Sequence, residues 1–166
     1  MGYTTEFKGK FKLKFKDETK RKKVTELVNG LANTRRMQRD MRKLENFTEK
    51  EIKDFGDEGE FYFPTENSKY YNFAGQNRKD PSILNYNKPP KNQPGLWLQW
   101  VITGNILEWN GGEKFYYYTE WLNYLIKKIF EPNNVEISGT ITYQGEEYED
   151  VGKIEIVNGK VYNIKI

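Results

Sequence analysis

Two clusters of acidic side chains are the residues of this chain that could hold a metal ion. Their members are Asp54, Asp57, Glu58 and Glu60 in one cluster and Glu146, Glu147, Glu149 and Asp150 in the other. Carboxylates bind Mg²⁺, which can activate water for phosphodiester hydrolysis. However, neither cluster has the spacing of a calcium loop, and adjacent acids beside glycines are more typical of solvated turns. We therefore predict no metal site.

The absence of two residue types excludes several catalytic classes. The 166 residues include no cysteine and no histidine. The chain therefore has no disulfide framework, no Ser-His-Asp or Cys-His nucleophile and no ordinary zinc site. Only carboxylates, lysines and tyrosines remain as general acids or bases. We expect a binding protein without a cofactor rather than an enzyme.

Basic side chains are concentrated near the N-terminus. Residues 8–43 hold fourteen Lys and Arg against four acidic residues, and the rest of the chain is net acidic. The candidates for contact with nucleic-acid phosphates are Lys8, Lys10, Lys12, Lys14, Lys16, Lys20, Arg21, Lys22, Lys23, Arg35, Arg36, Arg39 and Arg42. Each phosphate contact adds salt-sensitive affinity, and arginine also suits base recognition. The alternative is a solubilising face whose lysines prevent edge-to-edge pairing of sheets.

The aromatic stretch EKFYYYTEWLNYLIKKIF, residues 113–130, could form a second interface. If this stretch is a helix with 3.6 residues per turn, apolar and aromatic residues form one stripe along it that is as wide as a face buried in a protein core. A neighbouring stripe carries Tyr117, Trp121 and Tyr124. Tyrosine and tryptophan are enriched at binding hot spots, so this stripe is a candidate protein-binding surface. The alternative is that residues 46–93 bury it.

Alternating and helical patterns predict the elements that position these residues. Residues 7–15 alternate apolar residues with lysines, which predicts a strand with its lysines outward. Apolar residues at i, i+3, i+4 and i+7 predict a helix over 18–32, and a weaker helical pattern follows over 35–44. Further strands are predicted near 96–109 and over 135–166. We expect an α+β fold, with an antiparallel β-sheet and two main helices, near 18–32 and 113–130, packed on one face.

The last hairpin has two candidate registers. A two-residue Asn158-Gly159 turn would place Ile164 on the wrong face of the strand. A three-residue loop that includes Lys160 would pair Ile154 with Ile164, and the apolar pattern favours this longer loop.

Residues 46–93 carry no comparable pattern. Prolines interrupt them, Asn, Lys and Tyr dominate, and only residues 61–63 suggest a short strand. We predict a single domain, residues 1–166, with a long irregular connection at about 46–93, a kind of loop that is often functional.

No membrane segment is indicated. No apolar run approaches the ~20 residues that a membrane span needs. The N-terminal MGYTTEFKGK lacks the apolar stretch of a signal peptide. We expect a cytoplasmic protein without a membrane partner.

Three stretches carry a family resemblance: QPGLWLQW (93–100), EWNGGEKFYYYTEWLNYLIKKIFEP (108–132) and GTITYQGEEYEDVGKIEIVNGKV (139–161). They resemble a family of small bacterial and mobile-element proteins with no assigned biochemical activity. The resemblance implies one α+β unit and supplies no catalytic residues. More weakly, the chain is similar to anti-CRISPR proteins that act on Cas9 and its guide RNA, because it is small and phage-like, with a basic N-terminal β segment.

These features predict a mobile-element-borne protein that binds RNA or a ribonucleoprotein through its basic N-terminal region. Inhibition of Cas9 through its guide RNA is the specific form that the weaker resemblance implies. Two alternatives are a protein-binding module that uses the stripe of Tyr117, Trp121 and Tyr124, and a metal-dependent ribonuclease that uses one acidic cluster. The sequence does not indicate an oligomeric state.

Overall fold

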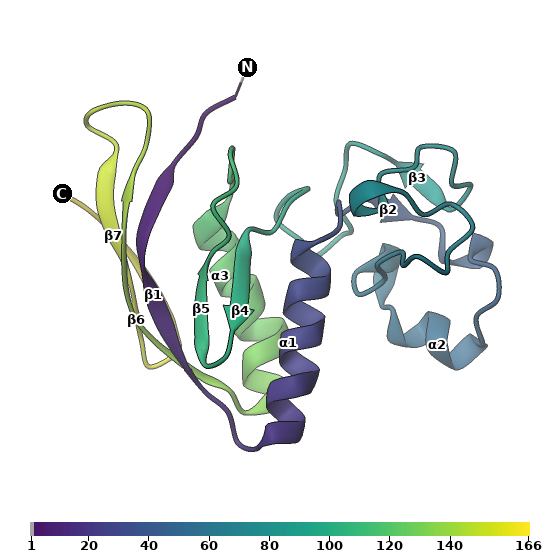
Figure 1. The fold of residues 1–166 in the computed structure, drawn as a ribbon, viewed down its shortest axis with the longest axis horizontal. Coiled ribbons are helices and arrows are strands. Elements are labelled where there is room, and N and C mark those ends of the chain that lie inside the picture. The colour runs from purple at the N-terminus through teal and green to yellow at the C-terminus, as the bar shows by residue number, and fades with distance from the viewer. Residues whose placement is uncertain (1) are drawn as a thin grey trace. The chain divides into compact units, whose positions relative to one another are not determined.

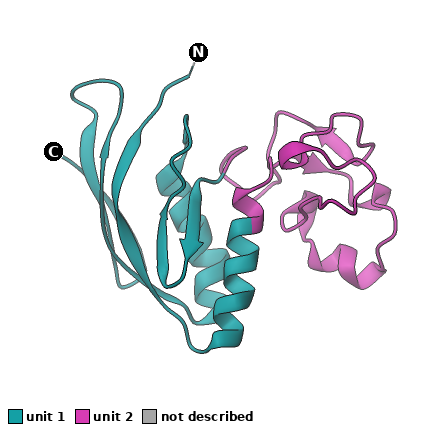
Figure 2. Ribbon diagram, in the orientation of Figure 1, with its two compact units in different colours: residues 1–29, 98–166 teal, residues 30–97 magenta. Residues whose placement is uncertain are grey.

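The structure is a computed structural model that describes residues 2–166, and these form two compact units (Figures 1 and 2). Unit 1 comprises residues up to 29 together with 98–166, and unit 2 comprises residues 30–97. The sequence predicted one domain with an irregular connection. Residues 30–97, which include that connection, form a compact unit of their own.

Unit 1 is built on a six-stranded antiparallel sheet. Its strands are β1 (Glu6–Lys14), β4 (Trp100–Thr103), β5 (Ile106–Trp109), β6 (Glu136–Gln144), β7 (Val151–Val157) and β8 (Lys160–Lys165). Their spatial order is β4-β5-β1-β6-β7-β8. β1 pairs with β6 along its full length, from Glu6 opposite Gln144 to Lys14 opposite Glu136. The predicted α+β class with an antiparallel sheet is confirmed.

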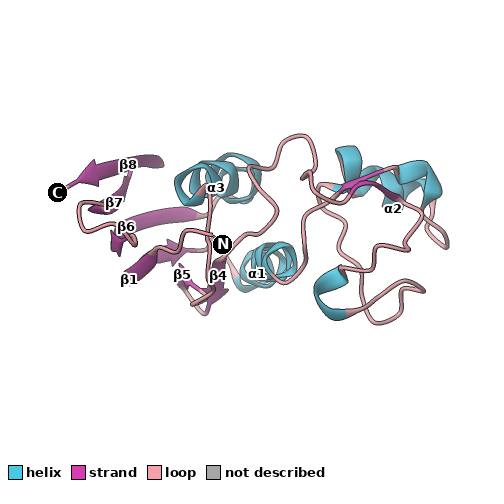
Figure 3. Ribbon diagram, turned by 90° about the horizontal axis from the view of Figure 1, so that it is seen from above, coloured by secondary structure: helices cyan, strands magenta, loops and turns pink. Residues whose placement is uncertain are grey.

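Two helices lie on one face of this sheet, as Figure 3 shows. The first is α1 (Glu18–Ala32), whose last three residues belong to unit 2. The second is α3 (Tyr118–Leu125), which continues through a π-helical turn, η4 (Ile126–Phe130), and a 3-10 turn, η5 (Glu131–Asn133). α3 begins later than the sequence predicted, because Lys114 and Tyr117 both have positive φ and the chain turns before the helix starts.

The core of unit 1 is largely aromatic. Phe7 packs edge-on against Trp100 and Tyr118, with ring centroids 5.1 and 5.0 Å apart. Phe11 is completely buried. The pairing of β1 with β6 requires a glycine at Gly139, where an added Cβ would lie 3.2 Å from the Lys10 carbonyl oxygen at a φ of +130°. Only glycine fits this position without strain.

The last hairpin has the shorter of the two registers. Val157 pairs with Lys160 across a two-residue turn, and Ile154 lies opposite Asn163. The predicted three-residue loop is therefore wrong. Asn158 and Gly159 have φ values of 51° and 75°, the left-handed pair that a tight hairpin turn prefers. Ile164 consequently lies on the outer face and is 40% exposed.

Unit 2 consists of short elements. They are β2 (Gln38–Arg39), which pairs with β3 (Ile83–Asn85), the helix α2 (Glu49–Asp54), and the 3-10 turns η1 (Met41–Lys43), η2 (Asp57–Gly59) and η3 (Phe73–Gly75). The predicted helix over 35–44 and the predicted strand at 61–63 are wrong. Polar contacts of buried side chains, rather than periodic apolar packing, fix this part of the chain.

Arg36 shows how these contacts organise unit 2. Its Nη2 donates hydrogen bonds to the carbonyl oxygens of Gly59, Glu60 and Tyr62 at 2.9–3.0 Å. Its Nε donates to Gln93 Oε1 at 3.1 Å, and its Nη1 donates to the Thr34 hydroxyl at 2.8 Å. One guanidinium therefore joins segments of unit 2 that are far apart in the sequence.

Candidate nucleic-acid interface

The lysines of β1 line the sheet face that the helices leave open. Lys8, Lys10, Lys12 and Lys14 are all exposed, whereas the side chains between them that point inward are buried. Successive side chains of a strand alternate between its faces, so these four lysines stand in one row about 7 Å apart. The predicted outward direction of these lysines agrees with the structure.

The neighbouring strand supplies hydroxyl groups to the same face. Across the β1–β6 pair, Lys8 lies opposite Thr142, Lys10 opposite Thr140 and Lys12 opposite Ser138. Hydroxyl groups and ammonium groups both donate hydrogen bonds to phosphate oxygens. Acidic residues stand only at the two ends of this pair, where Lys14 faces Glu136 and Glu6 faces Gln144. We call Lys8, Lys10, Lys12 and Lys14 the lysine row.

The lysine row has no salt-bridge partner within residues 2–166. The ion pairs of the described chain join Arg21 to Glu18, Arg39 to Asp80, Arg42 to Asp40, Lys153 to Glu155 and Lys165 to Asp150. Lys16, Lys22 and Lys23 are also exposed, and the Nζ of the half-buried Lys20 lies 3.5 Å from Asn133 Oδ1. The lysines therefore keep their charges available to a ligand.

The predicted arginines have local partners instead. Arg21 donates to Glu18, and this hydrogen bond holds the pKa of the Glu18 carboxyl below its usual range. Arg42 likewise holds the pKa of Asp40 down through its side-chain hydrogen bonds. Arg35 lies 4.0 Å above the centre of the Tyr86 ring. These three arginines help to fix their own surroundings.

Arg36 and Arg39 are only 1% and 3% exposed, so their predicted position on a nucleic-acid-binding surface is wrong. Arg39 Nη1 donates to Asp80 Oδ2 at 2.8 Å and to the Ser82 hydroxyl at 2.7 Å. Its guanidinium also lies 5.0 Å from the centre of the Tyr62 ring. The sequence could not show this burial, because the partners are up to 57 residues away and follow no periodic pattern.

The predicted exposed stripe of Tyr117, Trp121 and Tyr124 is also wrong. Trp121 is completely buried and Tyr124 is 6% exposed, with their rings edge-to-face at 5.4 Å. Tyr117 is 55% exposed and its neighbour Tyr116 is 46% exposed, because both precede the first turn of α3. The exposed aromatic surface of this segment is therefore a tyrosine pair, Tyr116 and Tyr117, and sequence analysis assigned Tyr116 no role.

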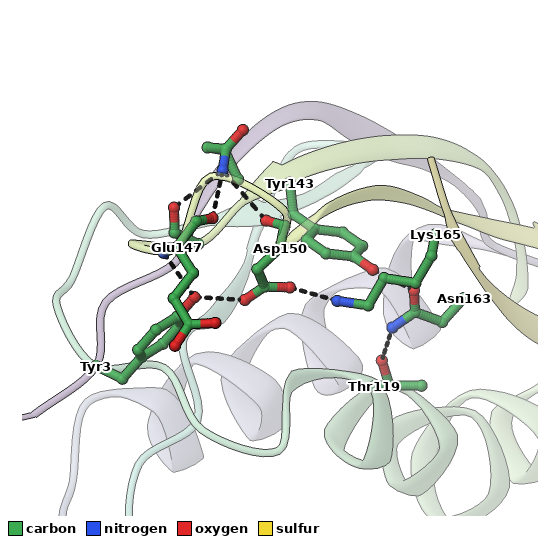
Figure 4. A network of polar contacts seen from close by, with 9 residues as sticks. Tyr3, Thr119, Tyr143, Glu147, Asp150, Asn163 and Lys165 are labelled. Carbon is green, nitrogen blue, oxygen red and sulfur yellow. Dashed lines mark hydrogen bonds and ion pairs between the residues drawn. The ribbon is translucent and has the colours of Figure 1, made fainter.

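One acidic cluster takes part in a polar network that sequence analysis did not predict (Figure 4). The Tyr3 hydroxyl donates to Asp150 Oδ2 at 2.7 Å, and Lys165 Nζ donates to Asp150 Oδ1. The Glu147 backbone N–H donates to the Tyr3 hydroxyl at 3.1 Å. The network therefore ties the N-terminal segment and the end of β8 to the turn between β6 and β7.

The electrostatics of this network favour a structural role. The hydrogen bond from Lys165 lowers the pKa of Asp150, and the same bond raises the pKa of Lys165. Burial raises the pKa of the nearby Tyr118 to about 12. Each shift moves a pKa further from neutral, whereas a general acid or base works best with a pKa near the operating pH. These groups hold fixed protonation states at neutral pH and act as a clamp.

The acidic residues do not converge on a point. Within the part of the chain that the structure describes, no group of three or more Asp or Glu side chains is placed to hold a metal ion. Asp54 and Asp57 are exposed, whereas Glu60 is buried.

A cavity in unit 2 is a feature that sequence analysis missed. It has a volume of about 490 Å³, and its wall includes the aromatic rings of Phe47, Phe55, Phe61, Phe63 and Tyr70. Cavities of this size and lining accept apolar or aromatic groups. The density of aromatic residues between 47 and 71 was the available signal in the sequence, but no pattern indicated that they converge.

Comparison with protein-family models, with curated proteins and with solved structures finds no match to this chain. Among the described residues, no helix is both long and apolar enough to cross a bilayer.

Proposed function

We propose that this protein binds RNA, alone or in a ribonucleoprotein, through the lysine row of β1. The observation that carries the proposal is the arrangement of Lys8, Lys10, Lys12 and Lys14, which are exposed in one row, unpaired with any acid of the described chain and bordered by hydroxyl groups. A row of positive charges attracts a phosphate backbone and releases its condensed counterions.

The composition of the interface favours backbone contact over base reading. Base-specific contacts rely on planar side chains such as arginine, asparagine and glutamine, and single-stranded bases stack on aromatic rings. The lysine row and the facing residues of β6 offer none of these apart from Gln144 at one end. The protein should therefore bind RNAs of different sequence with similar affinity.

The resemblance to mobile-element proteins and anti-CRISPR proteins makes Cas9 with its guide RNA the first ribonucleoprotein to test. On this proposal the protein is a mobile-element-borne inhibitor that acts in the cytoplasm. Because backbone contacts carry little sequence information, selectivity for one ribonucleoprotein would come from protein contacts. Tyr116 and Tyr117 are exposed and suit that role.

The decisive experiment compares two triple variants in an RNA-binding assay. Changing Lys8, Lys10 and Lys12 to Glu removes three of the four lysines of the row, and their partners on β6 are uncharged. Lys14 is left unchanged, because a glutamate there would face Glu136 and disturb the strand pairing. The control changes three exposed lysines of unit 2, Lys79, Lys88 and Lys91, to Glu, which alters the net charge equally.

We expect the β1 variant to lose at least tenfold in affinity for single-stranded RNA, with its thermal melting unchanged, and the control to lose much less. Equal losses in the two variants would show that only net charge matters, and the lysine row would not be the site. Absence of RNA binding by the wild-type protein at low salt, to both free guide RNA and the Cas9–guide complex, would refute the proposal.

A further inference from the structure

The two edges of the six-stranded sheet differ in how their backbone groups are satisfied. At the β4 edge, Asn29 from α1 covers the strand: its Oδ1 accepts from the Ile102 N–H at 2.8 Å and its Nδ2 donates to the Ile102 carbonyl at 2.9 Å. A side-chain amide thus replaces a neighbouring strand at this edge. Such cover is one way in which proteins prevent edge-to-edge association.

The β8 edge has no such cover. The Ile166 N–H donates to the Val151 carbonyl at 3.0 Å, so the even-numbered residues of this strand direct their backbone groups toward β7. Val161, Asn163 and Lys165 direct theirs away from the sheet. Within residues 2–166 no hydrogen bond reaches these outward N–H and carbonyl groups. Figure 3 shows β8 as the outermost strand.

The side chains of this edge are unusually apolar for an exposed strand. On the outer face, Tyr162 is 47% exposed and Ile164 is 40% exposed, beside Val157, which is 51% exposed. β8 has no proline, and its pairing with β7 shows no bulge. Its lysines stand only at the two ends, and the ammonium group of Lys165 is held by Asp150. β8 therefore has neither of two features that normally prevent edge-to-edge pairing, a proline or a bulge, and the charge of Lys165 is neutralised by Asp150.

We propose that β8 pairs antiparallel with β8 of a second copy of this chain, with a two-fold axis at Asn163. In this register Asn163 pairs with Asn163, and Val161 pairs with Lys165 of the other copy. All the outward N–H and carbonyl groups are then used, and six hydrogen bonds form across the axis. Tyr162 lies opposite Ile164 of the second copy, an aromatic and β-branched pair that stabilises antiparallel sheets.

The charges of the strand select a second copy as the occupant. In the same register Lys160 lies opposite Ile166, and Lys165 lies opposite Val161, so no lysine faces a lysine. A strand that is complementary to itself forms an isologous interface. The two outer faces then lie on one side of a continuous sheet and present both lysine rows to the same ligand. The self-association itself does not depend on RNA binding.

The test is sedimentation equilibrium of the full chain over a protein concentration of about 1–500 μM. An interface formed by one pair of edge strands is small, so we expect a dissociation constant in the micromolar range. The double variant Tyr162→Lys and Ile164→Thr removes the aromatic and β-branched pair across the axis and should weaken the dimer at least tenfold. Within its own sheet the new lysine faces Glu155, so the pairing of β8 with β7 is kept. The matched control is Val101→Lys with Ile106→Thr, which makes the same two kinds of change on the same face at the far edge of the sheet. Its new lysine faces Glu108, and it should leave the dimer unchanged.

Amide hydrogen exchange identifies the interface. The N–H groups of Val161, Asn163 and Lys165 should gain protection as the protein concentration rises, whereas those of Tyr162 and Ile164, already bonded to β7, should not change. A protein that stays monomeric at every concentration would overturn the proposal. A dimer that survives the double variant, or that forms without protection of the three outward N–H groups, would overturn it equally.

Discussion

The substitution Arg36→Met tests whether Arg36 stabilises the fold or contacts nucleic acid. Methionine keeps an unbranched apolar chain in place of the arginine methylenes but removes every donor of the guanidinium. The carbonyl oxygens of Gly59, Glu60 and Tyr62 would then lose a buried partner, together with Gln93 Oε1 and the Thr34 hydroxyl. We expect unit 2 to be strongly destabilised.

The magnitude follows from these five hydrogen bonds. A typical intramolecular hydrogen bond contributes about 1 kcal/mol net, and a buried acceptor left without a donor costs about 1–3 kcal/mol. Water that enters the space would satisfy part of the loss. We therefore expect the free energy of unfolding of unit 2 to fall by about 3–5 kcal/mol, somewhat less than 1 kcal/mol for each hydrogen bond lost.

Hydrogen exchange measured by mass spectrometry can follow the two units separately. Peptides from residues 30–97 should lose protection in Arg36→Met, whereas peptides from β1, β6 and β7 should keep it. The control is Lys91→Met, which removes an exposed cation of the same unit and should leave exchange in both units unchanged. Normal protection of residues 30–97 in Arg36→Met, combined with weaker RNA binding, would refute the structural role and restore Arg36 as a contact residue.

Three further predictions concern stability. Leu122→Ala should cost about 2–5 kcal/mol by urea denaturation, the range for a completely buried leucine, and the partly exposed Tyr116→Ala far less; equal costs would show that the phase of α3 is wrong. Gly139→Ala should cost more than ~1 kcal/mol, because its φ is +130° and the new Cβ would press on the Lys10 carbonyl; an unchanged melting temperature would contradict this. Burial raises the pKa of Tyr118 from 10.0 to about 12 in the folded protein. The neutral Tyr118 side chain therefore contributes its full share of stability below pH 10, and this contribution is lost as the pH rises from 10 to about 12. Wild-type protein should therefore lose more stability than Tyr118→Phe over this window, and parallel losses would exclude Tyr118 as the cause.

The sheet and its helices could be predicted because their patterns are periodic. The alternation in β1 and the helical stripe in α1 both report burial on one face, and sequence periodicity records such burial directly. The same argument failed for the β7–β8 hairpin. There the left-handed preference of Asn158-Gly159 fixed a two-residue turn, and the apolar Ile164 was left exposed.

The organisation of unit 2 could not be predicted, because it depends on hydrogen bonds between side chains and distant carbonyl groups. No spacing in the sequence shows that Arg36 meets residues 59–62, or that Arg39 meets Asp80. The excess of basic residues in this part of the sequence therefore led to the wrong prediction that both arginines lie on a nucleic-acid-binding surface. For β1, by contrast, alternation identified the face on which the lysines lie, and that part of the candidate site followed from the sequence.

The salt dependence of RNA affinity tests the central claim most directly. For single strands, the slope of log K against log salt concentration is about −0.7 per phosphate neutralised, so the four lysines of the row predict a slope near −3. In the variant with Lys8, Lys10 and Lys12 changed to Gln, the account predicts a slope near −1, with weaker binding at low salt. An unchanged slope in that variant would show that the phosphates are bound elsewhere, and the proposed interface would be wrong.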